Sequence, residues 1–231
     1  MSNSQPKRPE AGWILTPTMC ALAITSLLAG CSRSSDARAD AEPEAPAAET
    51  LYVARLQPLN QSVTGSAASG EVSFAITGDR LTLTTDAQGL PPGMTHWQHF
   101  HGFADGRDAA CPTQAEAGDD GIVDLIETEP VSGTTMVPFN DDPVAMDVPH
   151  GSYPQSTATG AMLYEKTVSL DALRAAFGKA FGGRDLNLDT RVVFLHGVPS
   201  ATELPRSVAS LGPIPAHVTL PIACGEIRRV R

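Results

Sequence analysis

Positive charge and aromatic side chains are scarce in this sequence. Its 231 residues hold 16 Lys and Arg against 26 Asp and Glu, which gives a formal net charge of −10, and only 5% are aromatic. Proteins that bind nucleic acid carry clusters of Lys and Arg that neutralise phosphates. The acidic balance therefore argues against nucleic acid as a partner.

Long apolar runs are missing as well. The most apolar stretch, residues 14–28, is interrupted by polar residues and a proline, and it is shorter than the roughly 20 residues that a membrane-spanning helix needs. It follows Lys7 and Arg8, and small residues lead from it to Cys31. Because this is the pattern of a secretory signal peptide, we predict that residues 1–30 are such a peptide.

The end of that segment, Leu28-Ala29-Gly30-Cys31, resembles the lipobox of bacterial lipoproteins. The resemblance implies cleavage before Cys31 and a lipid on its sulfur that anchors the chain to a membrane. Ser32 after the cysteine implies the outer membrane of the cell envelope, facing the periplasm. Residues 31–50 are rich in Ala, Pro and acidic residues and have no apolar pattern, so we predict a flexible tether there.

Cysteine is rare in the remainder, residues 51–231, which are long enough for one domain with its own core. Of four cysteines in the chain, only Cys111 and Cys224 fall in this part. In an oxidising compartment such a pair is most simply a disulfide. The closed loop of more than 100 residues would stabilise the fold by roughly 4 to 5 kcal/mol on a chain-entropy argument.

Alternating apolar residues predict a framework of β-strands. Residues 51–56, 70–77 and 81–84 read as strands, the last two as a hairpin around Gly78-Asp79. Further strands are expected at 160–168, 191–196 and 216–227, with Pro221 indicating an edge or a bulge. Ser169 would cap the single helix expected, over 170–181, and residues 103–167 read as long loops with one or two short strands. The prediction is an all-β fold with long loops and one short helix.

Three of the six histidines fall within six residues, at His96, His99 and His101. In a strand, side chains two residues apart point to the same face, so His99 and His101 present two imidazoles to one point. That is a metal-ligand arrangement. The spacing alone leaves another interpretation open, in which His99 and His101 are surface histidines or core histidines satisfied by hydrogen bonds.

An acidic segment, residues 116–127, has the spacing of an EF-hand calcium loop. Asp120, Asp124 and Glu127 stand at loop positions 5, 9 and 12, and Gly121 stands at position 6. These three acidic residues are candidate calcium ligands, although Gly118 removes the ligand at position 3. The alternative is a solvated acidic loop; the calcium hypothesis predicts that calcium raises the melting temperature.

Taken in order, several motifs resemble the copper/zinc superoxide dismutase family, a Greek-key β-barrel or sandwich. They are the GEVSF strand at 70–74, the turn and His-x-His of 89–101, Cys111, the Arg-x-x-x-x-His of 191–196 and the Ala-Cys-Gly-x-Ile of 223–227. The resemblance implies that copper is held by His99, His101 and His196. It also implies a structural His96 that ties loop backbone, the Cys111–Cys224 disulfide, and a copper centre that dismutes the small anion superoxide.

The sequence departs from that family at two places. Between Cys111 and His196 only His150 is available as a further metal ligand, so the family's zinc site is expected to be absent. His150 is a candidate bridging ligand, with a loop histidine as the alternative. Pro221 stands where the family has an anion-guiding arginine, and Arg107 or Arg206 would have to replace it. Two alternatives to a dismutase follow: a non-catalytic periplasmic copper-binding or structural module, or a chordin-repeat-type adhesion or scaffold domain.

Overall fold

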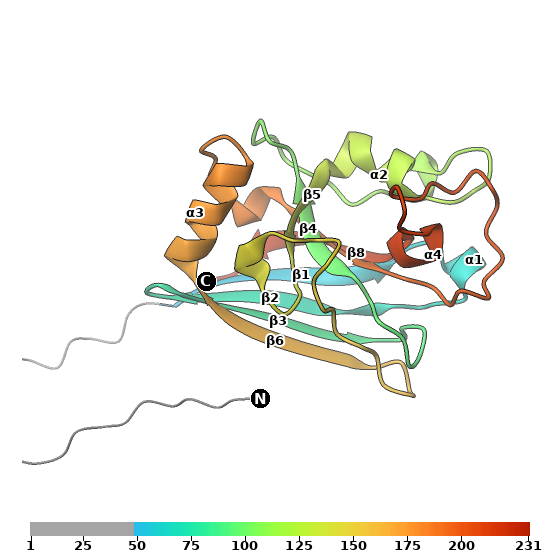
Figure 1. The fold of residues 1–231 in the computed structure, drawn as a ribbon, viewed down its shortest axis with the longest axis horizontal. Coiled ribbons are helices and arrows are strands. Elements are labelled where there is room, and N and C mark those ends of the chain that lie inside the picture. The colour runs from blue at the N-terminus through green and yellow to red at the C-terminus, as the bar shows by residue number, and fades with distance from the viewer. Residues whose placement is uncertain (1–48) are drawn as a thin grey trace, which may run out of the picture. The chain divides into compact units, whose positions relative to one another are not determined.

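One curled sheet of eight antiparallel strands forms the framework of the part that the computed structural model describes, residues 49–231. The strand order is β5-β4-β7-β8-β1-β2-β3-β6, and the sheet curls into a half-barrel with few short helices (Figure 1). The predicted all-β class is confirmed. The predicted signal peptide of residues 1–30, the lipidation site Cys31 and the tether up to residue 48 lie outside the described residues.

The strands and helices differ in length. The strands are β1 (Thr50–Pro58), β2 (Ser69–Thr77), β3 (Arg80–Gln88), β4 (Gln98–Gly102), β5 (Thr134–Pro138), β6 (Met162–Ser169), β7 (Val192–His196) and β8 (Pro221–Arg229). The helices are α1 (Gln61–Thr64), α2 (Leu125–Ser132), α3 (Leu170–Ala180) and α4 (Ala216–Thr219), with short 3₁₀ turns at Gln114–Glu116, Pro143–Ala145 and Leu188–Thr190. Within residues 49–231, none of these helices has the length and apolar character needed to cross a membrane.

The predicted hairpin is confirmed as β2 and β3, joined at Gly78 with a positive φ of 57°. Most of its inward side chains are buried, among them Phe74 and Leu83, because alternate residues of a strand face the same side. Phe74 contacts Phe139 edge to face across the core, with ring centroids 5.7 Å apart. The apolar interior of the half-barrel therefore follows from the period of two in the sequence.

Helix α3 covers one end of the sheet (Figure 1). As predicted, Ser169 caps it, since the hydroxyl accepts a hydrogen bond from the Ala172 N–H at 3.1 Å. Leu173 and Phe177 are buried beneath it, and the Phe177 ring approaches that of Phe100 on β4. The helix thereby closes the core behind the strand that carries the His-x-His pair.

Two parts of the prediction are wrong. Residues 103–167 contain helix α2 in addition to the expected short strand β5, because a capping box at Asp124 and Glu127 starts a helix there. The strand expected over 216–227 begins only at Pro221, since Ala216–Thr219 forms α4. Of the two alternatives predicted for Pro221, an edge strand is wrong, because β8 lies between β7 and β1. The bulge is confirmed, because Leu195 pairs with Ala223 but His196 pairs with Pro221, which shifts the register of β7 and β8 there.

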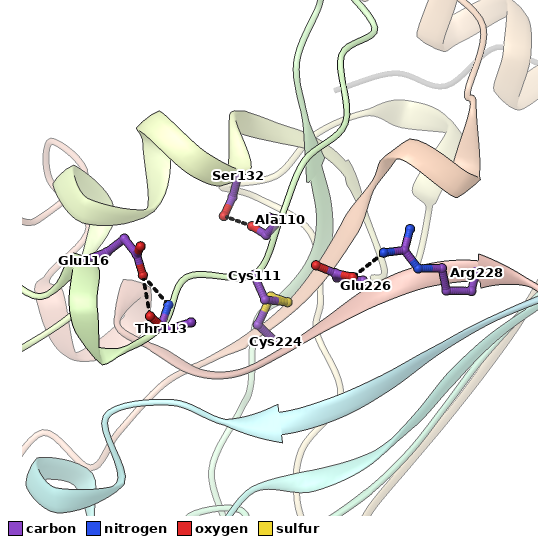
Figure 2. The surroundings of a disulfide bond; sticks show 8 residues. All are labelled: Ala110, Cys111, Thr113, Glu116, Ser132, Cys224, Glu226 and Arg228. Atoms are coloured by element: carbon purple, nitrogen blue, oxygen red, sulfur yellow. Dashed lines mark hydrogen bonds and ion pairs between the residues drawn. A yellow bond between two sulfur atoms is a disulfide. The ribbon is translucent and has the colours of Figure 1, made fainter.

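The predicted disulfide is confirmed between Cys111 and Cys224 on β8, with Cα atoms 5.8 Å apart (Figure 2). It holds the loop after β4 against the sheet. Beside it the Ser132 hydroxyl donates to the Ala110 carbonyl at 2.8 Å, and the Ala110 N–H donates to the Val131 carbonyl at 2.9 Å. The disulfide loop and the end of α2 are therefore tied together next to β8.

Candidate metal centre

Three histidines meet on neighbouring strands. His99 and His101 lie on β4, and His196 ends β7, which pairs with β4 in antiparallel register. The His196 N–H donates to the Trp97 carbonyl at 2.8 Å, which fixes the end of β7 next to the start of β4. Candidate ligand atoms of the three rings lie within 4.8 Å of one another. Among residues 49–231 this is the one group of three or more His, Cys, Asp or Glu that is so close.

The three rings are shielded from water. His99 and His101 are each 4% exposed and His196 is 3% exposed. The centroid of the His99 ring lies 4.8 Å from that of His101 and 4.5 Å from that of His196. Phe194 packs edge-on against His101 at 4.7 Å. The triad is therefore a compact nitrogen cluster with an apolar wall.

Hydrogen bonds to backbone carbonyls orient two of the three rings, those of His101 and His196. His196 Nδ1 donates to the Thr219 carbonyl at 2.7 Å, so its Nε2 carries a lone pair, and no partner faces that atom. His99 Nδ1 is likewise buried without a partner. His101 Nδ1 donates to the Gly133 carbonyl at 3.1 Å. Bonding of the second ring nitrogen in this way is how proteins present histidine to metal ions.

Burial keeps all three rings uncharged. Desolvation, with smaller repulsion from His196, lowers the pKa of His101 to about 3. Desolvation also lowers the pKa of His196 to about 4 and the pKa of His99 well below its ordinary value, with further repulsion from the other two rings. Metal ions bind the neutral imidazole, so near pH 7 the ligands need not lose a proton first. Three neutral imidazoles of this kind can bind a metal ion; the geometry does not identify the metal.

Two glycines allow the backbone to support His101. Gly133 has a φ of +74°, and a Cβ there would lie 2.1 Å from the Gly102 carbonyl oxygen. A Cβ on Gly102 would lie 2.3 Å from the guanidinium of Arg191, which is buried and donates to the Leu186 and Phe103 carbonyls. The carbonyl that orients His101 therefore depends on residues far from it in sequence. Sequence reasoning missed these supports, and no local pattern marks them.

His96 is buried in the turn before β4. Its Nδ1 lies 3.0 Å from the His196 carbonyl oxygen and its Nε2 lies 3.0 Å from the Pro91 carbonyl oxygen. The ring thus connects the turn to the end of β7. It lies outside the ligand group.

Other predicted site residues have contacts of their own, and His150 is not part of the triad. His150 is exposed and its Nδ1 contacts the Asp147 carboxylate at 2.9 Å. Arg107 stacks on the Phe103 ring at 3.7 Å and pairs with Asp105. A surface cavity of about 610 Å³ is lined by the disulfide and by outward side chains of β1 and β8, and not by the triad.

The three candidate calcium ligands do not form one cluster. Asp124 caps α2 by accepting from the Ile126 N–H at 2.7 Å, and its other oxygen accepts from the Ala209 N–H. Glu127 accepts from the Asp124 N–H at 3.0 Å, while Asp120 accepts from the Ile122 N–H and the Ser207 hydroxyl. The structure therefore uses these carboxylates to hold α2 and its flanking loops.

The chain was compared with models of known protein families and with curated proteins. No model of a known protein family matches the chain, and no curated protein matches it either. The site is described by its own geometry: three buried neutral imidazoles, two of them with a free buried nitrogen.

Proposed function

We propose that this chain is a copper-binding protein related to the copper/zinc superoxide dismutases, in which His99, His101 and His196 hold one copper ion. The observation that carries the proposal is the pair of partnerless buried nitrogens, His99 Nδ1 and His196 Nε2, in reach of the third ring. A buried polar atom without a partner costs about 1 to 3 kcal/mol. Coordination of a metal ion would remove that cost.

The donor set is compatible with copper. Imidazole suits zinc, copper, iron and nickel, and copper(II) heads the divalent affinity order. A structural zinc site is almost always closed by four protein ligands, whereas catalytic zinc is also held by three histidines and a water. The described part of the chain brings three such groups together here, so the preference for copper over catalytic zinc rests on the motif order in the sequence. Copper, when bound, supplies one-electron chemistry.

The strand order supports the proposed relationship. The chain leaves β6, crosses α3, and returns in β7 beside β4. In a Greek key, three hairpin-connected strands are followed by a fourth that returns by a long connection to lie beside the first. Strands β4 and β5 pair and β7 returns beside β4, whereas β6 pairs with β3 and not with β5. With the motif order in the sequence, the return of β7 to β4 supports a Greek-key fold of the superoxide dismutase type.

Between holding copper and turning over superoxide, the geometry favours holding. His99 Nδ1 and His196 Nε2 are both closed to solvent, and the position of the family's guiding arginine is taken by the buried, uncharged Pro221. A dismutase remains the second candidate because of the motif order.

A chordin-repeat-type scaffold gives His196 no role, although the ring lies within the ligand group. A lipid anchor at Cys31 in the outer membrane stays part of the proposal.

Metal analysis combined with a superoxide-consumption assay tests the proposal. The full chain is exported to the periplasm of a bacterial host, purified and assayed for copper, zinc and calcium. We expect close to one copper per chain and little superoxide consumption. Bound copper with rapid consumption would favour the dismutase. Absence of copper, even after incubation with copper salt, would refute the proposed function.

A further inference from the structure

One ligand nitrogen of the triad already has a partner. His101 Nδ1 faces the Gly133 carbonyl, which only accepts, so Nδ1 carries the proton of the neutral ring. Its Nε2 therefore carries a lone pair, and Nε2 lies 3.0 Å from the hydroxyl oxygen of Thr135. The hydroxyl is the only one of the two groups that can donate, so it points its hydrogen at the lone pair that a metal ion would use.

The contact is set by an irregularity in the sheet. Phe100 on β4 pairs with Val137 on β5, but the next residue, His101, pairs with Thr135, so Met136 is an extra residue on β5. Without that bulge, Met136 would stand opposite His101. Bulges redirect side chains and occur often next to functional sites. The same shift leaves Thr134 exposed, whereas Thr135 is half-buried.

We propose that the Thr135 hydroxyl is a built-in competitor for the metal, which occupies the third ligand in the metal-free protein and sets the affinity of the site. This inference rests on the proposed copper-binding function. On metal binding the hydroxyl turns away from His101 Nε2 and donates to water, which its half-buried position allows. No covalent bond changes. His99 and His196 need no such rearrangement, because their free nitrogens have no partner.

A valine at position 135 removes the hydroxyl and keeps the branched shape that suits a strand. Copper titration of the metal-free full chain is compared between the wild type, Thr135→Val and Thr135→Ser. Since a typical hydrogen bond has a modest net worth, Thr135→Val should bind copper about twofold to tenfold more tightly. Thr135→Ser keeps the hydroxyl and should resemble the wild type. Thr134→Val, on the exposed neighbour, is the matched control and should leave the affinity unchanged.

A measurement without metal tests the same contact. In nitrogen-15 spectra of the metal-free protein, the His101 Nε2 resonance should move toward that of a partnerless ring nitrogen in Thr135→Val and stay in place in Thr134→Val. An unmoved resonance would overturn the inference. So would copper binding by Thr135→Val that is equal to or weaker than that of the wild type, and in that case the proposed function stands. If no variant and no wild-type protein binds copper, the proposed function and the inference fail together.

Discussion

His99 and His196 each bury a ring nitrogen that nothing in the described structure satisfies. The spacing of His99 and His101 on one strand was enough to predict that their rings share a face. The direction in which the rings of His101 and His196 present their lone pairs was not predictable, because it depends on the Gly133 and Thr219 carbonyls. Those carbonyls come from the ends of α2 and α4, which are distant in sequence from the rings that they orient.

The buried histidines make the metal-free protein sensitive to acid. His101 and His196 have pKa values of about 3 and about 4 when folded, whereas an exposed histidine titrates near 6.5. Between these values the unfolded chain binds more protons than the folded one, so stability falls as pH falls from about 6.5 to about 4. Urea unfolding at several pH values should show this loss, and His196→Gln should show a smaller one. Parallel pH profiles for the two proteins would contradict this prediction.

Gly133 should tolerate no side chain. Gly133→Ala combines a positive φ with a Cβ placed 2.1 Å from the Gly102 carbonyl oxygen, so we expect a loss of more than about 2 kcal/mol in the free energy of unfolding. Gly106→Ala is the matched control, because Gly106 has a φ of +84° and open space around its Cβ position. It should lose only about 1 kcal/mol. Similar losses measured by chemical denaturation would show that the close approach at Gly133 is unimportant.

At the scale of elements, one spacing supported two different interpretations. Asp124 and Glu127 are three residues apart, which fits positions 9 and 12 of a calcium loop and equally fits the two ends of a capping box. The structure has the capping box, and α2 begins there. The helix was missed because Pro130 lies inside it and its apolar residues show no helical period, so its capping residues were its only sequence pattern. The strands were easier to predict because their alternation is regular.

The capping role of Asp124 predicts a loss of stability that calcium does not reverse. Its two oxygens accept from the N–H groups of Ile126 and Ala209, so Asp124→Ala should lower the free energy of unfolding by about 2 to 3 kcal/mol. Asp119→Ala, in the same acidic segment, should change it by less than about 0.5 kcal/mol. Thermal melts of the wild type with and without millimolar calcium should coincide. A rise in melting temperature that Asp124→Ala abolishes would support the calcium hypothesis instead.

At the scale of the whole molecule, the metal centre depends on pairing between distant segments. The order of the motifs pointed to an all-β fold, but alternation within single strands does not say that β4 lies beside β7 or that β8 lies between β7 and β1. These pairings bring His196 to His99. They are long-range contacts, and only the resemblance to a known family suggested them from the sequence.

The disulfide should contribute several kcal/mol to global stability. It joins residues 113 positions apart, and closing so long a loop in the unfolded chain is worth about 4 to 5 kcal/mol. Urea unfolding of a Cys111→Ser, Cys224→Ala double variant should show a loss of that order. Cys111→Ser alone should be equally affected, because either substitution opens the loop. A loss below about 1 kcal/mol would mean that the unfolded chain is already compact in this region.

Copper titration of the metal-free full chain tests the central claim most directly. We predict that the wild type binds one equivalent and that His150→Ala, which changes an exposed histidine outside the triad, binds with the same affinity. His196→Ala should bind at least about 100-fold more weakly, since even residues that only support metal ligands are worth 10- to 100-fold. Unchanged affinity in His196→Ala, or loss of binding in His150→Ala, would contradict the three-histidine copper site.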